Sequence, residues 1–166
     1  MSILPLPEHF GSREWFIIVT LICSNALIIP LRRKFPPTII ILILVFGLTS
    51  AKIMDVLVGE APFDYYDIND TPKVELMDVV LQFIYPPFAY LYIYLYERLH
   101  IRGISTALYV LISSFFGICF EWIFVCFGVF MYKGWNLFYS FTVYLYVQSA
   151  CLLFFKWIQS NHHRKR

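Results

Sequence analysis

The sequence predicts an all-α polytopic membrane protein, a single transmembrane domain over residues 1–166 that forms a bundle of five transmembrane helices. Composition is the first reason: 60% of the residues are hydrophobic and only 14% are charged, against about 45–50% and about 25% in soluble domains. Size is the second, because so short a chain has too little interior to bury that much apolar surface. These observations exclude a soluble globular domain, a disordered chain and a nucleic-acid-binding protein with a broad basic face.

Five apolar runs approach the roughly 20 residues that a helix needs to cross a bilayer. They cover residues 15–31, 38–58, 76–96, 104–131 and 137–158. The first is short, and the fourth is long enough to tilt or to end before Met131. Pro36-Pro37 open the second span, where a helix tolerates a missing N–H group, and Pro86-Pro87 should kink the third. Because the first run lacks the basic start and cleavage pattern of a signal peptide, we expect it to remain as a helix.

The basic residues are sorted between the two sides of the predicted bundle. Nine Lys and Arg residues fall on one side, in 32–34, 98–102 and 156–166, and three fall on the other. Since Lys and Arg concentrate in cytoplasmic loops, we predict a cell-membrane protein with its N-terminus outside and its C-terminus in the cytoplasm. Residues 59–75 are then an outer acidic loop, and 159–166 form a basic cytoplasmic tail that would bind anionic lipids.

The cysteines and acidic residues do not indicate a metal site or a cofactor. All four cysteines lie inside apolar runs without C-x-x-C spacing, so we expect buried free thiols that act as small hydrophobic residues. They are Cys23, Cys119, Cys126 and Cys151. The acidic loop lacks the ligand spacing of an EF-hand and is interpreted as a solvated loop.

Six polar side chains lie inside the predicted spans, where a charge costs about 2.5–3.5 kcal/mol at the membrane centre. They are Lys52 and Asp55 in the second span, Asp78 and Gln82 in the third, Glu121 in the fourth and Gln148 in the fifth. We interpret this set as a candidate ligand-binding site in a polar interior that opens toward the outside. Lys52 and Asp55 are three residues apart and can pair on one helical stripe.

Glu121 is the most deeply placed of these groups. Ser113, Gly117 and Gly128 share its helical face, and small residues allow close helix packing, so Glu121 should face protein. With Lys52 assigned to Asp55, we expect Glu121 to be protonated and to donate a hydrogen bond to a partner such as Gln148 or Tyr85.

Several short motifs follow one another along the chain. They are Arg13-Glu14-Trp15, Asp55-x-x-x-Gly59, Asp78 followed by Pro86-Pro87, and Glu121 followed by Gly128, Tyr132, Trp135 and Tyr139-Ser140-Phe141. Together they resemble a family of small, functionally uncharacterised multi-pass membrane proteins of spore-forming bacteria. The resemblance covers most of the chain and implies a membrane topology, without an activity. Lys52 has no counterpart in that pattern.

Three functions stay open at this point. The favoured one is an integral membrane protein whose carboxylate-bearing interior binds a small ligand, a cation or a proton. The second is an accessory or structural subunit of a membrane complex, in which polar residues specify helix register and partner choice. The third is a lipid- or isoprenoid-modifying membrane enzyme with Glu121 as acid or base; no residue is assigned a catalytic role. The expected partners are the lipid bilayer and a second copy or a membrane protein, but no nucleic acid.

Overall fold

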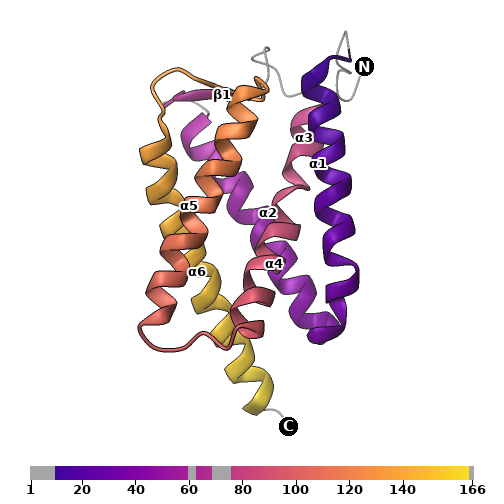
Figure 1. Ribbon diagram of the computed structural model, residues 1–166, viewed down its shortest axis with the longest axis vertical. Helices are drawn as coiled ribbons and strands as arrows, with labels where there is room; N and C mark the ends of the chain where they lie inside the picture. Colours follow the sequence, from indigo (N-terminus) through magenta and orange to yellow (C-terminus); the bar gives the residue numbers. More distant parts are fainter. Residues whose placement is uncertain (1–9, 60–62, 69–75, 165–166) are drawn as a thin grey trace.

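The computed structural model of the protein describes residues 10–59, 63–68 and 76–164. Within them the elements are α1 (Ser12–Ile28), the short 3-10 helix η1 (Pro30–Lys34), α2 (Pro37–Gly59), β1 (Tyr66–Ile68), α3 (Leu76–Gln82), α4 (Tyr85–Arg98), α5 (Ser105–Cys126), β2 (Phe130–Tyr132) and α6 (Leu137–Arg164). The helices run up and down along the long axis of the molecule, so that α1 begins at one end and α6 finishes at the other (Figure 1).

The prediction of a helical protein with membrane-spanning segments is confirmed at the level of helix length and composition. Among the described residues, four helical segments are long and apolar enough to cross a membrane: Pro37–Gly59, Leu76–Arg98, Ser105–Cys126 and Leu137–Asn161. Large apolar side chains are exposed along them, as expected for a surface that faces lipid. The segment corresponding to the first predicted span, α1, has 17 residues, fewer than the roughly 20 that the bilayer core requires.

The third predicted span is interrupted, as its two prolines lead one to expect. Helix α3 ends at Gln82, and α4 begins at Tyr85 with Pro86 and Pro87 in its first turn. Proline is suited to that position because the first N–H groups of a helix have no partner within the helix. The break turns one predicted kinked helix into two helices and places Tyr85 at the start of the second.

The helices pack as two groups. Helix α2 packs most extensively on α4, α1 packs on α3 and α4, and α5 packs on α6. Glycines allow the closest approaches: a Cβ atom at Gly47 of α2 would lie 2.8 Å from Cβ of Ala89 on α4. A Cβ atom at Gly117 of α5 would lie 3.2 Å from the ring of Tyr144 on α6. The small-residue face of the fourth span therefore does face protein, as predicted.

The fourth span ends earlier than the predicted range 104–131. Helix α5 stops at Cys126, and Gly128 takes φ +71°, a left-handed conformation that favours glycine, so Gly128 lies beyond the helix. Residues Phe130–Tyr132 then form β2, which pairs antiparallel with β1. This two-stranded ribbon connects the segment after α2 to the segment between α5 and α6, and the sequence analysis does not predict it.

The register of the ribbon places two tyrosines opposite each other. Tyr66 pairs with Tyr132, and Ile68 pairs with Phe130. Side chains of directly opposed residues lie on the same face of an antiparallel pair, so both tyrosines extend from one face. Backbone N–H groups of residues 133–135 converge on the carbonyl oxygen of Tyr65, at 2.9, 3.0 and 3.2 Å, and close the ribbon at its end.

The acidic loop is partly described and carries ion pairs. Nζ of Lys133 lies 3.0 Å from Oδ1 of Asp64 and 2.9 Å from Oδ1 of Asp67. These hydrogen bonds raise the pKa of the exposed Lys133 above its ordinary value. The predicted loop residues Glu60, Asp70 and Glu75 lie outside the described residues, as do the last two residues of the basic tail.

Buried side chains form two hydrophobic clusters. One contains Ile43, Tyr90 and Phe155, and the other contains Ile17, Leu81 and Val129 near the ribbon. The expectation of buried cysteines is right for Cys151 only; all four thiols are free, but Cys23, Cys119 and Cys126 are exposed on the apolar surface. Exposure there is compatible with their apolar character, because lipid is the solvent of that surface in a membrane.

Candidate functional site

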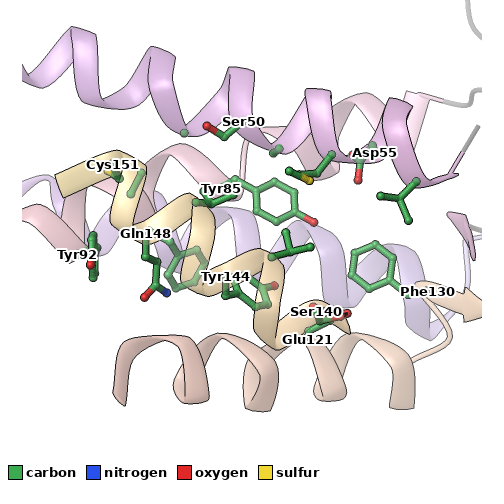
Figure 2. Close-up of a pocket in the computed structure, with 18 of the residues that line it drawn as sticks. Ser50, Asp55, Tyr85, Tyr92, Glu121, Phe130, Ser140, Tyr144, Gln148 and Cys151 are labelled. Atoms are coloured by element: carbon green, nitrogen blue, oxygen red, sulfur yellow. Dashed lines mark hydrogen bonds between the residues drawn. The ribbon is translucent and has the colours of Figure 1, made fainter. Parts of the chain in front are cut away.

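Two neighbouring cavities lie between the helix groups, on the inner side of the ribbon. The first, of about 210 Å³, is lined by α2, α4, α6 and both strands, together with Glu121 of α5. The second, of about 410 Å³, is lined by α4, α5 and α6 and by Phe130. They share Tyr85, Phe88, Tyr92, Glu121, Phe130, Tyr144 and Gln148. Most lining side chains are aromatic or aliphatic, and the polar groups are few and grouped (Figure 2).

Asp55 lies on α2 at the ribbon end of the first cavity. Its Oδ1 accepts a hydrogen bond from the Tyr66 hydroxyl at 2.7 Å, and its Oδ2 accepts one from Nε2 of Gln82 on α3. Burial and the neighbouring carboxylate raise the pKa of Tyr66 far above its ordinary value, so its hydroxyl stays protonated and donates. The carbonyl oxygen of the buried Gln82 side chain has no partner within the described residues.

Glu121 lies on α5, across the cavity from Asp55. Its Oε1 accepts hydrogen bonds from the Tyr132 hydroxyl at 2.5 Å and from Oγ of Ser140 at 2.6 Å. Oγ of Ser140 in turn accepts a bond from Nε1 of Trp135 at 2.7 Å. Burial and the bond to Glu121 raise the pKa of Tyr132, which keeps its hydroxyl a donor.

The ribbon connects the two carboxylates through its opposed tyrosines. Tyr66 on β1 binds Asp55 on α2, and Tyr132 on β2 binds Glu121 on α5. One cross-strand pair therefore connects helices that belong to different packing groups. The hydroxyls of Tyr85 and Tyr144 point into the space near these two carboxylates (Figure 2).

Three of the six residues predicted for the site meet at this end of the bundle: Asp55, Gln82 and Glu121. Gln148 lines both cavities farther along α6, where its Oε1 accepts a hydrogen bond from Ser114 at 3.1 Å. Asp78 lies one turn before Gln82 on α3 and lines neither cavity.

Lys52 lines neither cavity and forms no direct ion pair with Asp55 within the described residues, but its charge attracts that carboxylate. Its side chain is exposed on the surface of α2, and within the described residues the hydrogen bonds of Asp55 come from Tyr66 and Gln82. Positions three residues apart on a helix are neighbours, but they need not point in the same direction. Here Asp55 lines the first cavity, and Lys52 does not.

The expected partners of Glu121 were also wrong. Its hydrogen bonds come from Tyr132 and Ser140 rather than from Gln148 or Tyr85. Tyr132 could not be placed beside Glu121 from helical spacing, because the chain leaves the helix at Cys126 and returns as a strand.

Three hydroxyl groups that bind the carboxylates, and the indole that binds one of these hydroxyls, are not among the predicted site residues. Tyr132, Trp135 and Ser140 belong to the motif that follows Glu121. Their polar atoms lie near a predicted membrane interface, and this was the sequence signal that could have identified them. Tyr66 carries no such signal, since it lies in a loop rich in polar residues. Its role depends on the ribbon, which brings together residues 66 positions apart in the sequence.

The charge of the lining is one-sided. Within the described residues, the two cavities are lined by the carboxylates Asp55 and Glu121 and by no Lys, Arg or His. The same part of the chain contains no group of three or more His, Cys, Asp or Glu residues placed to hold a metal ion.

No family model, curated protein or solved structure matches the chain.

Proposed function

We propose that the chain is an integral membrane protein of five transmembrane helices that binds a small cationic ligand in the cavity between its helix groups. In this proposal α1 crosses the membrane in addition to the four longer helical segments. The N-terminus lies outside and the C-terminus lies in the cytoplasm. The bilayer is the solvent of the exposed apolar surface, and the ribbon end of the bundle faces outward. We propose ligand binding and assign no residue a catalytic role.

One observation carries the proposal: two carboxylates line the cavities, and no basic side chain in the described residues lines them with Asp55 and Glu121. A buried carboxylate is unfavourable unless it is neutralised or well hydrogen-bonded. The donors from Tyr66, Gln82, Tyr132 and Ser140 are all neutral, so a cation or a proton would complete the site. The aromatic lining also favours an organic cation, because aromatic rings attract ammonium groups.

The proposal is tested with purified protein in phosphatidylcholine nanodiscs, whose neutral lipids keep surface charge from attracting the probe. Octylamine, octanol and octanoate have matched chains and differ in the charge of the head. We expect octylamine to raise the unfolding temperature and to bind saturably, whereas octanol binds weakly and octanoate does not bind.

The variants Asp55→Asn and Glu121→Gln connect such binding to the carboxylates. Each keeps the side-chain shape and the ability to accept a hydrogen bond but removes the negative charge. We expect the affinity for octylamine to fall about tenfold or more in each variant, equivalent to about 1.4 kcal/mol. Asp64→Asn is the matched control, since it removes the same charge from an exposed residue that lines neither cavity. Equal binding of the three probes would contradict the proposal.

A structural role is the second candidate, and the ribbon contacts favour it specifically. Tyr66 and Tyr132 tie Asp55 and Glu121 to one pair of strands, which is a way of specifying helix register with buried polar groups. An accessory subunit would keep its function in Glu121→Gln, because an amide oxygen still accepts from Tyr132 and Ser140. It would also be recovered from detergent extracts with a partner protein, whether or not octylamine binds.

A further inference from the structure

The end of the cavity away from the carboxylates contains a polar group that nothing in the described residues satisfies. The hydroxyl of Tyr92 is buried without a hydrogen-bond partner there, and the residue is 8% exposed. Tyr92 lines both cavities. Buried hydroxyls are nearly always hydrogen-bonded in folded proteins, so this orphan group indicates that something else reaches it.

The ring of Tyr92 cannot easily turn away to find another partner. It stacks on Tyr109, with 5.0 Å between ring centroids and 18° between ring planes. The Tyr109 hydroxyl also donates a 2.6 Å hydrogen bond to the backbone carbonyl of Tyr92. The neighbouring helix and ring therefore hold the hydroxyl at the cavity.

The two polar ends of the cavity are well separated. Figure 2 shows Asp55 and Glu121 at one end and Tyr92 and Cys151 toward the other, with Tyr85 between them. Tyr85 and Tyr92 are seven residues apart on α4, a rise of about 10 Å along the helix. The wall between them consists mainly of apolar side chains such as Phe88 and Ala89.

From this arrangement we infer that the ligand is an elongated amphipathic amine with a second, uncharged hydrogen-bonding group at the opposite end of its apolar chain from the ammonium group. The inference rests on the proposed function. The ammonium group lies between Asp55 and Glu121, the apolar chain follows α4, and the second group bonds to the hydroxyl of Tyr92. A hydroxyl, carbonyl or amide would serve at that end, because a tyrosine hydroxyl both donates and accepts.

The test compares ω-aminooctanol, octylamine and ethanolamine in the same nanodiscs. The first probe carries an amine and a hydroxyl at opposite ends of its chain, the second lacks the hydroxyl, and the third lacks the spacing. We expect ω-aminooctanol to bind wild type about five- to tenfold more tightly than octylamine, since one hydrogen bond contributes about that much. Ethanolamine should bind far more weakly than either.

Tyr92→Phe removes only the unpartnered oxygen atom, so it should fold at least as stably as wild type. In this variant we expect the affinity ratio of ω-aminooctanol to octylamine, about five- to tenfold in wild type, to fall to about one. Tyr146→Phe is the matched control, because Tyr146 is an exposed tyrosine on α6; it should keep the wild-type preference.

The outcomes separate this inference from the proposed function. If neither long-chain amine binds, the proposed function fails and the inference fails with it. If both amines bind wild type equally, or if the preference survives in Tyr92→Phe, the cavity binds amines but Tyr92 does not select a second group. The inference is then overturned while the proposed function stands.

Discussion

At the scale of single residues, the two cavity carboxylates differ in how their oxygens are used. Both oxygens of Asp55 accept a hydrogen bond, one from Tyr66 and one from Gln82. Glu121 accepts two bonds at Oε1, and Oε2 takes neither of them. Hydrogen bonds that donate to the charged form stabilise it. The Tyr144 hydroxyl also interacts with Glu121, so both carboxylates are surrounded by neutral hydrogen-bond donors.

Ser140 is the residue whose loss should disturb the site most, because its hydroxyl connects two groups. Ser140→Ala removes a donor to Glu121 and also leaves Nε1 of Trp135 without its acceptor. Each unsatisfied buried group costs about 1–3 kcal/mol, so Ser140→Ala should destabilise more than Tyr132→Phe, which removes one bond. Thermal unfolding in nanodiscs measures the difference, and the tryptophan emission of Ser140→Ala should shift.

Ser149→Ala provides the control, since Ser149 lies on the same helix and is exposed. Its unfolding temperature should stay within error of wild type. A Ser140→Ala protein as stable as Ser149→Ala would show that the bonds to Glu121 and Trp135 contribute little.

At the scale of elements, hydropathy predicts the helices well and their ends less well. The predicted spans 38–58 and 76–96 differ by no more than two residues at either limit from Pro37–Gly59 and Leu76–Arg98. The fifth helix runs past its predicted end at 158 to Arg164, because a polar helical turn carries no apolar signal. The fourth was predicted five residues too long, since residues 127–131 are apolar whether they form a helix or a strand.

The ribbon is outside the reach of periodicity because each strand has three residues. Alternation over so short a stretch cannot be distinguished from chance, and pairing between distant segments is a tertiary effect. The polar site depends on that pairing, so only its helical members could be predicted from the sequence.

The close contact between α2 and α4 depends on Gly47. Gly47→Ala adds a Cβ atom 2.8 Å from Cβ of Ala89, where neither backbone can yield cheaply. Overpacking of this kind costs about 1–3 kcal/mol, of which alanine returns up to about 1 kcal/mol through its helix propensity. We therefore expect a lower unfolding temperature for Gly47→Ala.

A second change tests the cause of that loss. Ala89→Gly removes the methyl group that the new side chain meets, so Gly47→Ala combined with Ala89→Gly should be more stable than the sum of the two single changes predicts. Strict additivity would assign the loss to the other close approach, 3.0 Å from the new Cβ atom to Cα of Pro86, which Ala89→Gly leaves in place.

The ion pairs of the ribbon predict a pH dependence. The hydrogen bonds that the Lys133 ammonium group donates to Asp67 and Asp64 raise the pKa of Lys133 in the folded protein above the ordinary 10.5. Their contribution is then fully present below about pH 10.5 and is lost as the pH rises through the folded pKa. The unfolding temperature of wild type should exceed that of Lys133→Gln by a small, constant amount between about pH 6 and pH 9, and the difference should shrink in more alkaline buffer.

High salt offers an independent check on the same pairs. Lys133 is exposed, so added salt should screen its attraction to Asp64 and Asp67 and reduce the difference between the two proteins. A difference that grows with pH or is insensitive to salt would assign the effect of Lys133→Gln to something other than these pairs.

At the scale of the whole molecule, the cavity lies where two packing groups meet without filling the space between them. The α2–α4 group contributes Asp55, the α5–α6 group contributes Glu121, and the ribbon joins them at one end. The sequence predicts carboxylates on interior faces because buried charge is rare in membrane spans. It could not predict which faces meet, since hydropathy says how much of a helix is apolar and not which neighbour it packs on.

Topology is the property of the whole chain that a single experiment decides. In the proposed topology of five crossings, the two ends of the helical bundle would lie on opposite sides, and the nine-to-three division of Lys and Arg predicts a cytoplasmic C-terminus. Alkaline phosphatase, which is active only outside the cytoplasm, should be inactive when fused after Arg166 and active when inserted within residues 62–72. Green fluorescent protein at the same two positions should give the inverse pattern and shows that each fusion is made. Strong phosphatase activity after Arg166 with none within residues 62–72 would reverse the orientation. Activity at both positions would mean that the three apolar helical segments between them, Leu76–Arg98, Ser105–Cys126 and Leu137–Asn161, do not all cross the membrane.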